Sequence, residues 1–251
     1  MHADEQLLAF DKPSGLPVQS RGNKARCLDE LLWAFAKSNG KRPRLVHRLD
    51  TGTSGVIVAA RTKPVAATLA QAFAERTVTK TYLALVSGDI PATEAGRVEQ
   101  PLLKVESSAG QPAHAVVASA GARGSKPALT DWRVISRSQS AALIEAIPST
   151  GRMHQIRAHL AFLGCPILGD PLYGTRAQSA PRLMLHARTL VLPGFGTAAD
   201  DLCLEAGDLF QENAFVSGQV AHHFLVEQLN GIDRRPAGDD FHAGGLTDIV
   251  T

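Results

Sequence analysis

The sequence predicts an α+β domain built on a central mixed, mostly antiparallel sheet. Short runs rich in β-branched residues and bounded by Gly, Pro or Ser predict strands. Two of these runs, 129–135 and 141–147, are joined by a short polar segment, as in an antiparallel hairpin. Stretches that repeat apolar residues every third or fourth position predict amphipathic helices. With 251 residues, 44% of them hydrophobic, the chain can bury a sizeable core without disulfides.

In the N-terminal part we expect two strands and two helices. The strands are the apolar run 7–10 and the β-branched run 56–58. The first helix covers 28–38 and ends at the cap signal Asn39-Gly40. One face of this helix is apolar: Leu28, Leu31, Leu32 and Phe35. The second helix begins at a Thr62 cap with Pro64 in its first turn and runs to Phe73.

The C-terminal part begins with a strand over 80–86, followed by loops around short strands over 87–126. The hairpin leads into a helix over 152–164, and a last strand covers 182–192. The helix has an apolar stripe: Met153, Ile156, Leu160 and Leu163. In the turn-rich segment after the helix, Asp170 and Tyr173 are assigned structural roles.

Several classes of protein are disfavoured. The first eight residues include Asp4 and Glu5, unlike a signal peptide, and no apolar run is long enough to span a membrane. Three widely spaced cysteines predict neither a disulfide framework nor a zinc site. We therefore expect a cytoplasmic protein that holds no metal.

Charge is distributed unevenly along the chain. Residues 1–197 contain 24 Lys and Arg against 14 Asp and Glu, whereas residues 198–251 contain 2 against 10. We predict a basic domain over 1–197 and an acidic, partly disordered extension over 198–251. A basic body is typical of a protein that binds a polyanion, although solvated surfaces alone can give similar counts.

The segment 45–60 places one acid, Asp50, in a turn between two apolar runs. An Asp in such a turn can simply bond its own backbone. However, His47 and Arg48 lie just upstream, and Lys41, Arg42 and Arg44 crowd the preceding loop. This basic cluster is either ordinary surface or a group that holds phosphates beside the acid.

The segment 149–160 is the second concentration of polar side chains. Arg152 and His154 stand at the N-terminal end of the predicted helix, where anions are favoured, and Gln155 and Arg157 follow. A purely structural helix is the alternative, since Arg and Gln form helices well. Tyr82 is either a half-buried strand aromatic or a platform on which a base stacks.

Four motifs together resemble those of the RluA-type family of RNA pseudouridine synthases, over residues 7–193. They occur in the family's order and spacing. The motifs are Lys12-Pro13-Ser14-Gly15-Leu16-Pro17, His47-Arg48-Leu49-Asp50 with Thr53-Ser54-Gly55, Lys80 to Val86, and Thr150 to Arg157 with Gly169 to Gly174.

The resemblance implies the pseudouridine synthase fold and isomerisation of a uridine within an RNA chain, without metal or cofactor. Asp50 would be the essential carboxylate, acting as nucleophile or as general base, and Arg152 would pair with it. Tyr82 would stack on the uracil and Ile156 would form another wall of the pocket. Arg48 would fill the place that the flipped base leaves.

By the same resemblance, the remaining polar residues would bind substrate: His47, Lys80, His154, Gln155 and Arg157. Thr51-Gly52 and Met153 depart from the family pattern within the active-site segments. We expect no S4-type RNA-binding domain before Leu7, so recognition would rest on the catalytic domain and on structured stem-loops of rRNA or tRNA. We expect a monomer.

Two other functions stay open at this point. The chain could be an RNA-binding or folding factor that has kept the fold without catalysis. It could also be a small-molecule hydrolase that uses Asp50, such as a nucleoside glycosidase. Function retained by Asp50→Asn would favour the first, and release of free uracil would favour the second.

Overall fold

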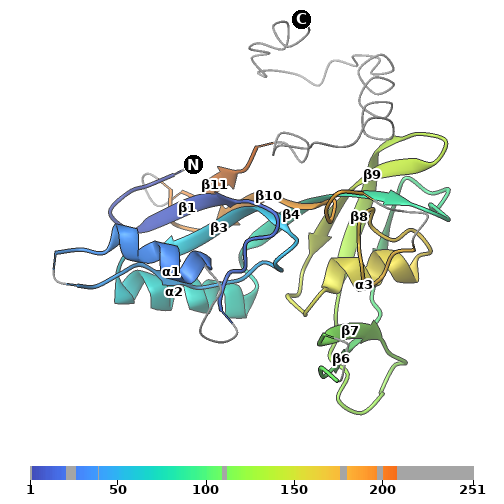
Figure 1. Cartoon of the computed structure of the whole chain (residues 1–251), viewed down its shortest axis with the longest axis horizontal. Coiled ribbons are helices and arrows are strands. Elements are labelled where there is room, and N and C mark those ends of the chain that lie inside the picture. Colours follow the sequence, from blue (N-terminus) through green and yellow to red (C-terminus); the bar gives the residue numbers. More distant parts are fainter. Residues whose placement is uncertain are drawn as a thin grey trace, which may run out of the picture. The chain divides into compact units, whose positions relative to one another are not determined.

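The structure is a computed structural model of the whole chain, shown in Figure 1. It describes residues 2–20, 27–38, 40–108, 112–175, 180–196 and 200–207, and all structural statements below concern these ranges. Among these residues, no helix is long and apolar enough to cross a membrane.

One large sheet forms the frame of the molecule. Its main strands lie in this order: β1 (Leu7–Lys12), β3 (Ser54–Ala60), β10 (Leu185–Leu192), β4 (Thr79–Ser87), β9 (Ala141–Pro148), β8 (Thr130–Arg137) and β5 (Ala95–Val98). Only the β3–β10 pairing is parallel among the described strands. A separate antiparallel pair joins β6 (Leu102–Val105) to β7 (His114–Val117). The predicted mixed, mostly antiparallel sheet and the predicted hairpin are confirmed.

The two halves of the sheet meet at a short parallel junction. Strands β3 and β10 pair only through Ser54 with His186 and Gly55 with Ala187. Beyond it the two strands diverge, and short strands occupy the edges that become available. Strand β2 (Arg44–Leu45) pairs with β3, and β11 (Leu202–Glu205) pairs with β10.

Strand β3 is buried on both faces, which explains its continuous apolar sequence. Val56, Val58 and Ala60 belong to a core cluster that includes Leu69 of helix α2 (Lys63–Glu75). Ile57 points the other way, into a cluster with Leu49 that Tyr82 packs against. Helix α2 begins as predicted, because the Thr62 hydroxyl accepts a hydrogen bond from Val65 N at 3.4 Å.

The first predicted helix is shorter than expected. Helix α1 (Leu28–Leu31) continues only as a single 3-10 turn, η1 (Leu32–Phe35). Because a 3-10 turn has about three residues instead of 3.6, apolar residues spaced for an α-helix no longer share one face. Leu28 and Leu32 are buried, but Leu31 and Phe35 are exposed, so the predicted four-residue face is wrong.

The helix predicted over 152–164 begins later, as α3 (Gln155–Phe162). His154 has φ +50 and ψ 24, a left-handed conformation that cannot continue a right-handed helix. Ile156 and Leu160 are buried as expected, whereas Met153 and Leu163 lie outside the helix and are half-buried. Helix α3 contacts β7, β8 and β9.

The sheet extends past the predicted domain boundary at residue 197. Strand β11 pairs with β10, and Leu204 and Ala206 are buried in the same core cluster as Leu190. The acidic composition of the segment concealed this short apolar strand. The helix or strand expected within 209–229 and the loose segment expected over 231–251 lie outside the described residues.

Candidate active site

A cavity of about 590 Å³ lies where the loop before β3, the end of α2, strand β4, the end of β9 and the start of α3 meet. All ten residues predicted from the sequence line this cavity: His47, Arg48, Asp50, Lys80, Tyr82, Arg152, His154, Gln155, Ile156 and Arg157. The fold thus brings together segments about a hundred residues apart. Asp50 is the one acidic side chain among the lining residues.

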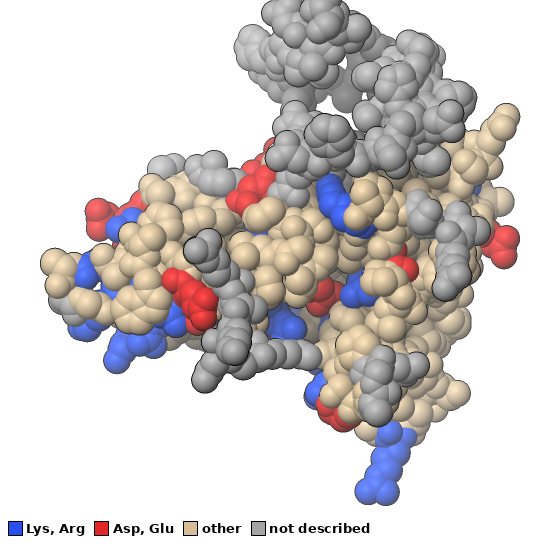
Figure 2. Space-filling model, in the orientation of Figure 1, with Lys and Arg blue, Asp and Glu red and all other residues tan. Residues whose placement is uncertain are grey.

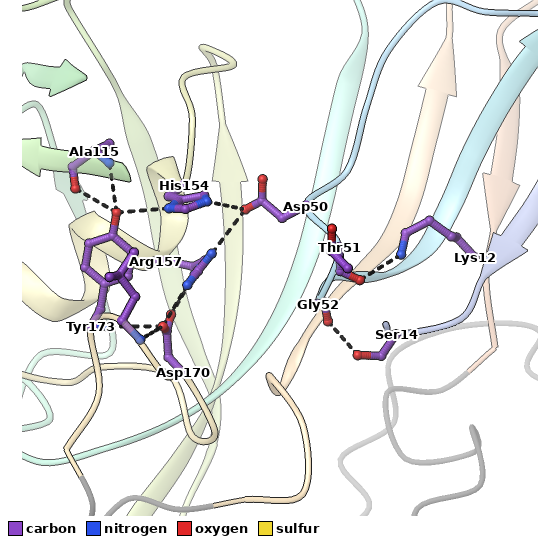
Figure 3. A network of polar contacts seen from close by, with 11 residues as sticks. Lys12, Ser14, Asp50, Thr51, Gly52, Ala115, His154, Arg157, Asp170 and Tyr173 are labelled. Carbon is purple, nitrogen blue, oxygen red and sulfur yellow. Dashed lines mark hydrogen bonds and ion pairs between the residues drawn. The ribbon is translucent and has the colours of Figure 1, made fainter. Parts of the chain in front are cut away.

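The turn that carries Asp50 is held by the loop after β1. Thr53 N donates to Asp50 O at 3.0 Å and closes the turn. Lys12 is only 1% exposed, and its ammonium donates to Thr51 O at 3.2 Å. Ser14 Oγ donates to Gly52 O at 2.7 Å (Figure 3). The Lys12-Pro13-Ser14-Gly15 motif therefore positions the acid, a role that its turn chemistry alone did not reveal.

Arg157 links Asp50 to a second carboxylate. Its guanidinium forms a two-pronged ion pair with Asp170, with Nε–Oδ2 2.7 Å and Nη2–Oδ1 2.8 Å. The third nitrogen, Nη1, lies 3.6 Å from Asp50 Oδ2 (Figure 3). Burial alone would raise the pKa of Asp170, but the hydrogen bonds and charge of Arg157 outweigh this effect and hold the pKa below its usual value. Asp170 thus orients the cation that faces Asp50, which the structural role assigned to it from sequence did not include.

The predicted partner of Asp50 is corrected by this geometry. Arg152 was expected to pair with Asp50, but its Nε donates to the Pro127 carbonyl at 3.0 Å. Arg152 precedes the left-handed residue His154, so its backbone lies in the loop and not on the helix. Arg157, expected from the sequence to bind substrate, is buried between two carboxylates.

His154 also faces Asp50, with Nε2 3.8 Å from Oδ2. Its other nitrogen, Nδ1, lies 3.2 Å from the Tyr173 hydroxyl. That hydroxyl donates to Ala115 O at 2.7 Å and accepts from Ala115 N at 3.1 Å. Because the single hydroxyl proton is used, Nδ1–H is the donor to Tyr173, and a neutral His154 presents the Nε2 lone pair to Asp50.

Burial lowers the pKa of His154, although the charge of Asp50 acts in the opposite direction. The imidazole is therefore neutral at pH 7, with an unprotonated nitrogen directed at the carboxylate. Tyr173, assigned a structural role from the sequence, fixes this tautomer.

The side chain of Gln155 is fully occupied by the protein. Its oxygen accepts from Thr150 Oγ1 at 2.6 Å and from Arg152 N at 3.0 Å. Its amide nitrogen donates to Leu129 O and Thr130 Oγ1 at 2.8 and 3.0 Å. Substrate binding by Gln155 stays a prediction, and in the structure its buried amide fastens the loop before α3 to the β8 end of the hairpin.

Tyr82, on β4, and Ile156, on α3, both line the cavity. Burial, with a further contribution from the charge of Asp50, raises the pKa of the Tyr82 hydroxyl well above its usual value of 10.0. The phenol stays protonated at neutral pH, so it can donate a hydrogen bond and present its ring. A phenolate base is disfavoured.

His47 supports the loop before Asp50. Its ring stacks on Phe73 with a centroid distance of 4.6 Å, and Nε2 accepts from Val58 N at 3.0 Å. Burial, together with the charge of Lys80, lowers the pKa of His47 from 6.5 to about 3. A neutral ring with one nitrogen bonded to the backbone is suited to holding the loop, and less to binding a phosphate.

Three further cations line the cavity besides the two arginines described above. Arg48 is exposed, and Lys80 Nζ donates to Thr150 O at 3.4 Å. Burial lowers the pKa of Lys80, with a smaller effect from Arg76. Arg76, the left-handed cap of α2, was not predicted from sequence, because a helix C-terminus commonly carries a basic residue for other reasons. In Figure 2, Lys and Arg side chains border the hollow in the middle of this face.

Comparison with known proteins identifies the arrangement. The sequence profile of the family described as RNA pseudouridylate synthase matches residues 6–162. This range exceeds half of the chain and includes Asp50, Tyr82 and Arg157. The chain belongs to the RNA pseudouridylate synthase family. Its members are RNA isomerases, so the chain is an enzyme of this class.

Similar sequences agree with this assignment. An uncharacterised RNA pseudouridine synthase of Zymomonas mobilis is 36% identical over 189 residues, which cover 74% of this chain and 84% of the relative. Ribosomal large subunit pseudouridine synthase D of the same organism is 39% identical over 191 residues, which cover 73% of this chain. This chain spans only 58% of that second relative's length.

Solved structures of the family share the fold. Human RNA pseudouridylate synthase domain containing 4 has a TM-score of 0.67 at 32% identity, covering 82% of this chain and 87% of that one. Human RNA pseudouridylate synthase domain containing 1 has a TM-score of 0.68 at 26% identity, with 92% and 93% covered. The pseudouridine synthase fold expected from the sequence motifs is confirmed.

Proposed function

We propose that this pseudouridine synthase isomerises specific uridines in structured RNA, with Asp50 as the essential carboxylate. The position of Asp50 supports the proposal most strongly. It is the acid of a cavity otherwise lined by basic, neutral polar and apolar side chains, and its turn is anchored from outside the cavity. Its carboxylate is 22% exposed, so a ribose can reach it.

The reaction rearranges bonds without adding atoms. The bond from ribose C1′ to uracil N1 breaks, the base rotates while it is held, and a bond from C1′ to C5 forms. The proton leaves C5, and N1 gains one. Asp50 can act as the nucleophile at the ribose or as the base that removes a ribose proton, and both roles require the ionised form.

Arg157 and His154 would then act on Asp50. The Arg157 guanidinium faces the carboxylate and would orient it, and Asp170 keeps the guanidinium in place. The Nε2 lone pair of neutral His154 could accept a proton that Asp50 takes from the substrate. We assign His154 this proton-holding role in place of the substrate binding expected from the sequence.

Tyr82 and Ile156 would hold the uracil between an aromatic ring and an aliphatic side chain. The base must leave its stack to reach them, which costs a few kcal/mol and least in loops or bulges. Exposed Arg48 would occupy the vacated position. Lys80 and Arg76, which also line the cavity, would contact phosphates, which position the RNA without reading its sequence.

A stem-loop of rRNA or tRNA is the proposed substrate. One relative is named for the large ribosomal subunit, which supports rRNA. A monomer acting in the cytoplasm remains our expectation, although a human relative that is 33% identical carries mitochondrial in its name.

The test is a pseudouridine map of total rRNA and tRNA from cells that lack this gene. The cells are complemented with wild type, Asp50→Asn or an empty vector. We expect one or a few positions to disappear and to return only with wild type. The rate of the purified Asp50→Asn enzyme should fall by at least about 100-fold, while its unfolding curve matches wild type.

Each other outcome points elsewhere. Restoration of the modified positions by Asp50→Asn would show that Asp50 is dispensable. If the modification map is the same in every strain, and Asp50→Asn restores growth of the deletion strain as well as wild type does, the protein is an RNA-binding factor and not a catalyst. Free uracil released from RNA by the purified enzyme would show glycosidase chemistry. If the lost positions do not return when the cells are complemented with wild type, another enzyme modifies them.

A further inference from the structure

The short segment α1–η1 exposes three large apolar side chains. Trp33 is 58% exposed, Leu31 46% and Phe35 43%. Trp is rarely left in water, because it carries the largest apolar surface of any side chain. The chain's other Trp, Trp132, is 6% exposed. The exposed ring therefore needs an explanation beyond the packing of this domain.

One face of the Trp33 ring is already occupied. The guanidinium carbon of Arg42 lies 5.4 Å from the ring centroid. Arg42 is held there by Asp29, with Nη1–Oδ1 2.7 Å and Nη2–Oδ2 2.8 Å, and it also donates to Asp29 O at 2.6 Å. The charge of Arg42 is thus paired, and its planar group serves as a fixed support beneath the indole.

The surroundings of this ring are basic. Residues 28–44 contain four Lys and Arg against two acids, and Asp29 is one of those acids. Lys37, Lys41 and Arg44 are exposed. In Figure 2, Lys and Arg side chains line the lower edge of the end where α1 and α2 lie, with some Asp and Glu side chains beside them. An aromatic plane within a cationic surface is the combination that binds unpaired nucleotides, by stacking and by phosphate contacts.

The segment is close to the catalytic cavity. Arg42 precedes the cavity residue Arg48 by six positions, so their Cα atoms are at most about 22 Å apart. Phe35 packs edge-on against Phe10 at 5.4 Å, and Phe10 packs on the cluster that includes Leu49, the neighbour of Asp50. An RNA with its target uridine in the cavity can therefore extend to this surface.

We propose that Trp33, supported by Arg42, is a stacking platform for an unpaired base of the RNA substrate outside the catalytic cavity. This inference rests on the proposed function only in taking RNA as the partner. The charge around the ring and its fixed cationic support favour RNA over a protein partner, for which neither feature is needed.

Intrinsic fluorescence can test the platform directly, because Trp33 is the exposed one of the two Trp residues. The Asp50→Asn enzyme is titrated with a hairpin transcript that has a uridine-rich loop, and with a fully paired duplex of equal length. We expect the hairpin to quench the emission and the duplex to leave it nearly unchanged. A Trp33→Phe variant should show no such quenching.

Affinity gives the second measurement. Removing one base–aromatic stack by Trp33→Ala should weaken hairpin binding about 5- to 150-fold. Trp33→Phe keeps a ring and should bind within a few fold of wild type. The matched control is Phe162→Ala, because Phe162 on α3 is 52% exposed but lies outside this segment. Its affinity should not change.

The results separate the platform from the proposed function. Hairpin binding without quenching, and with equal affinity for Trp33→Ala, would overturn the platform and leave catalysis intact. Quenching by RNA without any pseudouridine formed by wild type would support the platform and contradict the proposed function. If Trp33→Ala changes the oligomeric state but not RNA affinity, the surface is a protein interface. Failure of every RNA to bind would overturn the platform and count against an RNA substrate.

Discussion

At the scale of single residues, Arg157 is the centre of the site. One guanidinium serves two carboxylates: it is bound tightly to Asp170, whose side chain is fully buried, and more loosely to Asp50. The tight pair fixes its orientation, so the nitrogen that faces Asp50 is in place before substrate arrives. A buried pair of this kind is costly to break from one side, because the remaining charge is left without a partner.

We predict different consequences for the two arginines of this segment. Arg157→Gln should lower the free energy of unfolding by about 3 to 5 kcal/mol, because Asp170 loses its partner. Single-turnover activity, measured at a temperature where the variant is folded, should fall about 100-fold because Asp50 loses its oriented cation. Arg152→Gln should change stability by less than about 0.5 kcal/mol.

Two further variants separate charge from geometry. Arg157→Lys keeps the charge but not the two-pronged pair, so its activity should lie between those of wild type and Arg157→Gln. Asp170→Asn should destabilise the enzyme because Arg157 loses its buried carboxylate partner, while the Asp50 carboxylate itself is retained. If Arg152→Gln abolished the reaction while Arg157→Gln retained it, the assignment of the Asp50 partner would be wrong.

Every site residue predicted from the sequence lines the cavity, but the sequence did not show which role each one has. Asp50, Tyr82 and the 152–157 segment stood out because polar groups were concentrated there. The choice between Arg152 and Arg157 depends on one left-handed residue, His154, which ends the loop and starts the helix. A helical pattern does not encode that conformation. Lys12 and Asp170 were hidden for a related reason: Lys12 bonds to Thr51, 39 residues away, and Asp170 pairs with Arg157, 13 residues away, so neither contact shows as a local pattern.

At the scale of elements, the β3–β10 junction depends on Gly55. This residue has φ +106, and an added Cβ would overlap the Ala187 carbonyl of β10. Gly15, in the loop that holds the Asp50 turn, also has a positive φ, +87, but a Cβ there would meet nothing within 4 Å. The two glycines thus share the conformational requirement and differ in the close approach of another strand.

A comparison of Gly55→Ala with Gly15→Ala should isolate that close approach. Both variants incur the backbone cost of a left-handed residue, about 1 to 2 kcal/mol. Gly55→Ala must also separate two strands of the central sheet, so it should be at least about 2 kcal/mol less stable than Gly15→Ala in urea unfolding. Equal losses would mean that the strands adjust without cost.

Elements with a strong local pattern were predictable, and those defined by their partners were not. Strand β3, helix α2 and the β8–β9 hairpin formed as predicted, because their own sequences contain the apolar pattern or the cap residue that defines them. Helix α1 was predicted too long because its apolar spacing reflects, in part, exposed residues. Strand β11 was missed because it is four residues long and becomes a strand by pairing with β10.

At the scale of the whole molecule, four histidines share one electrostatic property. Burial lowers the pKa of each one: His47, His154, His159 and His186. His159 and His186 are also fixed by hydrogen bonds, to Thr130 and Gln100 and to Ser54 and Gly207. The folded enzyme therefore binds fewer protons in acid than the unfolded chain does.

We predict that stability falls as the pH falls below about 6.5. In that range the unfolded histidines gain protons at a higher pH than the folded ones do, so protonation favours unfolding. Each such histidine contributes up to about 1.4 kcal/mol per pH unit. For His47 the loss should continue down to about pH 3. Urea unfolding from pH 7.5 to 4.5 at constant ionic strength measures the slope.

His47→Gln is the matched variant, because its amide oxygen can accept the Val58 hydrogen bond and does not titrate. Its stability should depend less steeply on pH, by up to about 1.4 kcal/mol per unit between pH 5.5 and 4.5. Identical slopes for the two proteins would mean that His47 is protonated in the folded state.

The order of the strands has a consequence for how the enzyme is made. Strands β3 and β4 are neighbours along the chain, yet β10 lies between them in the sheet. About a hundred residues separate β4 from β10, so a ribosome that adds about 5 to 20 residues per second needs about 5 to 20 s to supply the missing strand. Asp50 is made before that interval and Arg157 is added within it, and until β10 pairs with both β3 and β4 the two residues lie on parts of the sheet that are not yet joined. The nascent chain therefore completes its catalytic site only when β10, one of the last described strands, is inserted between β3 and β4.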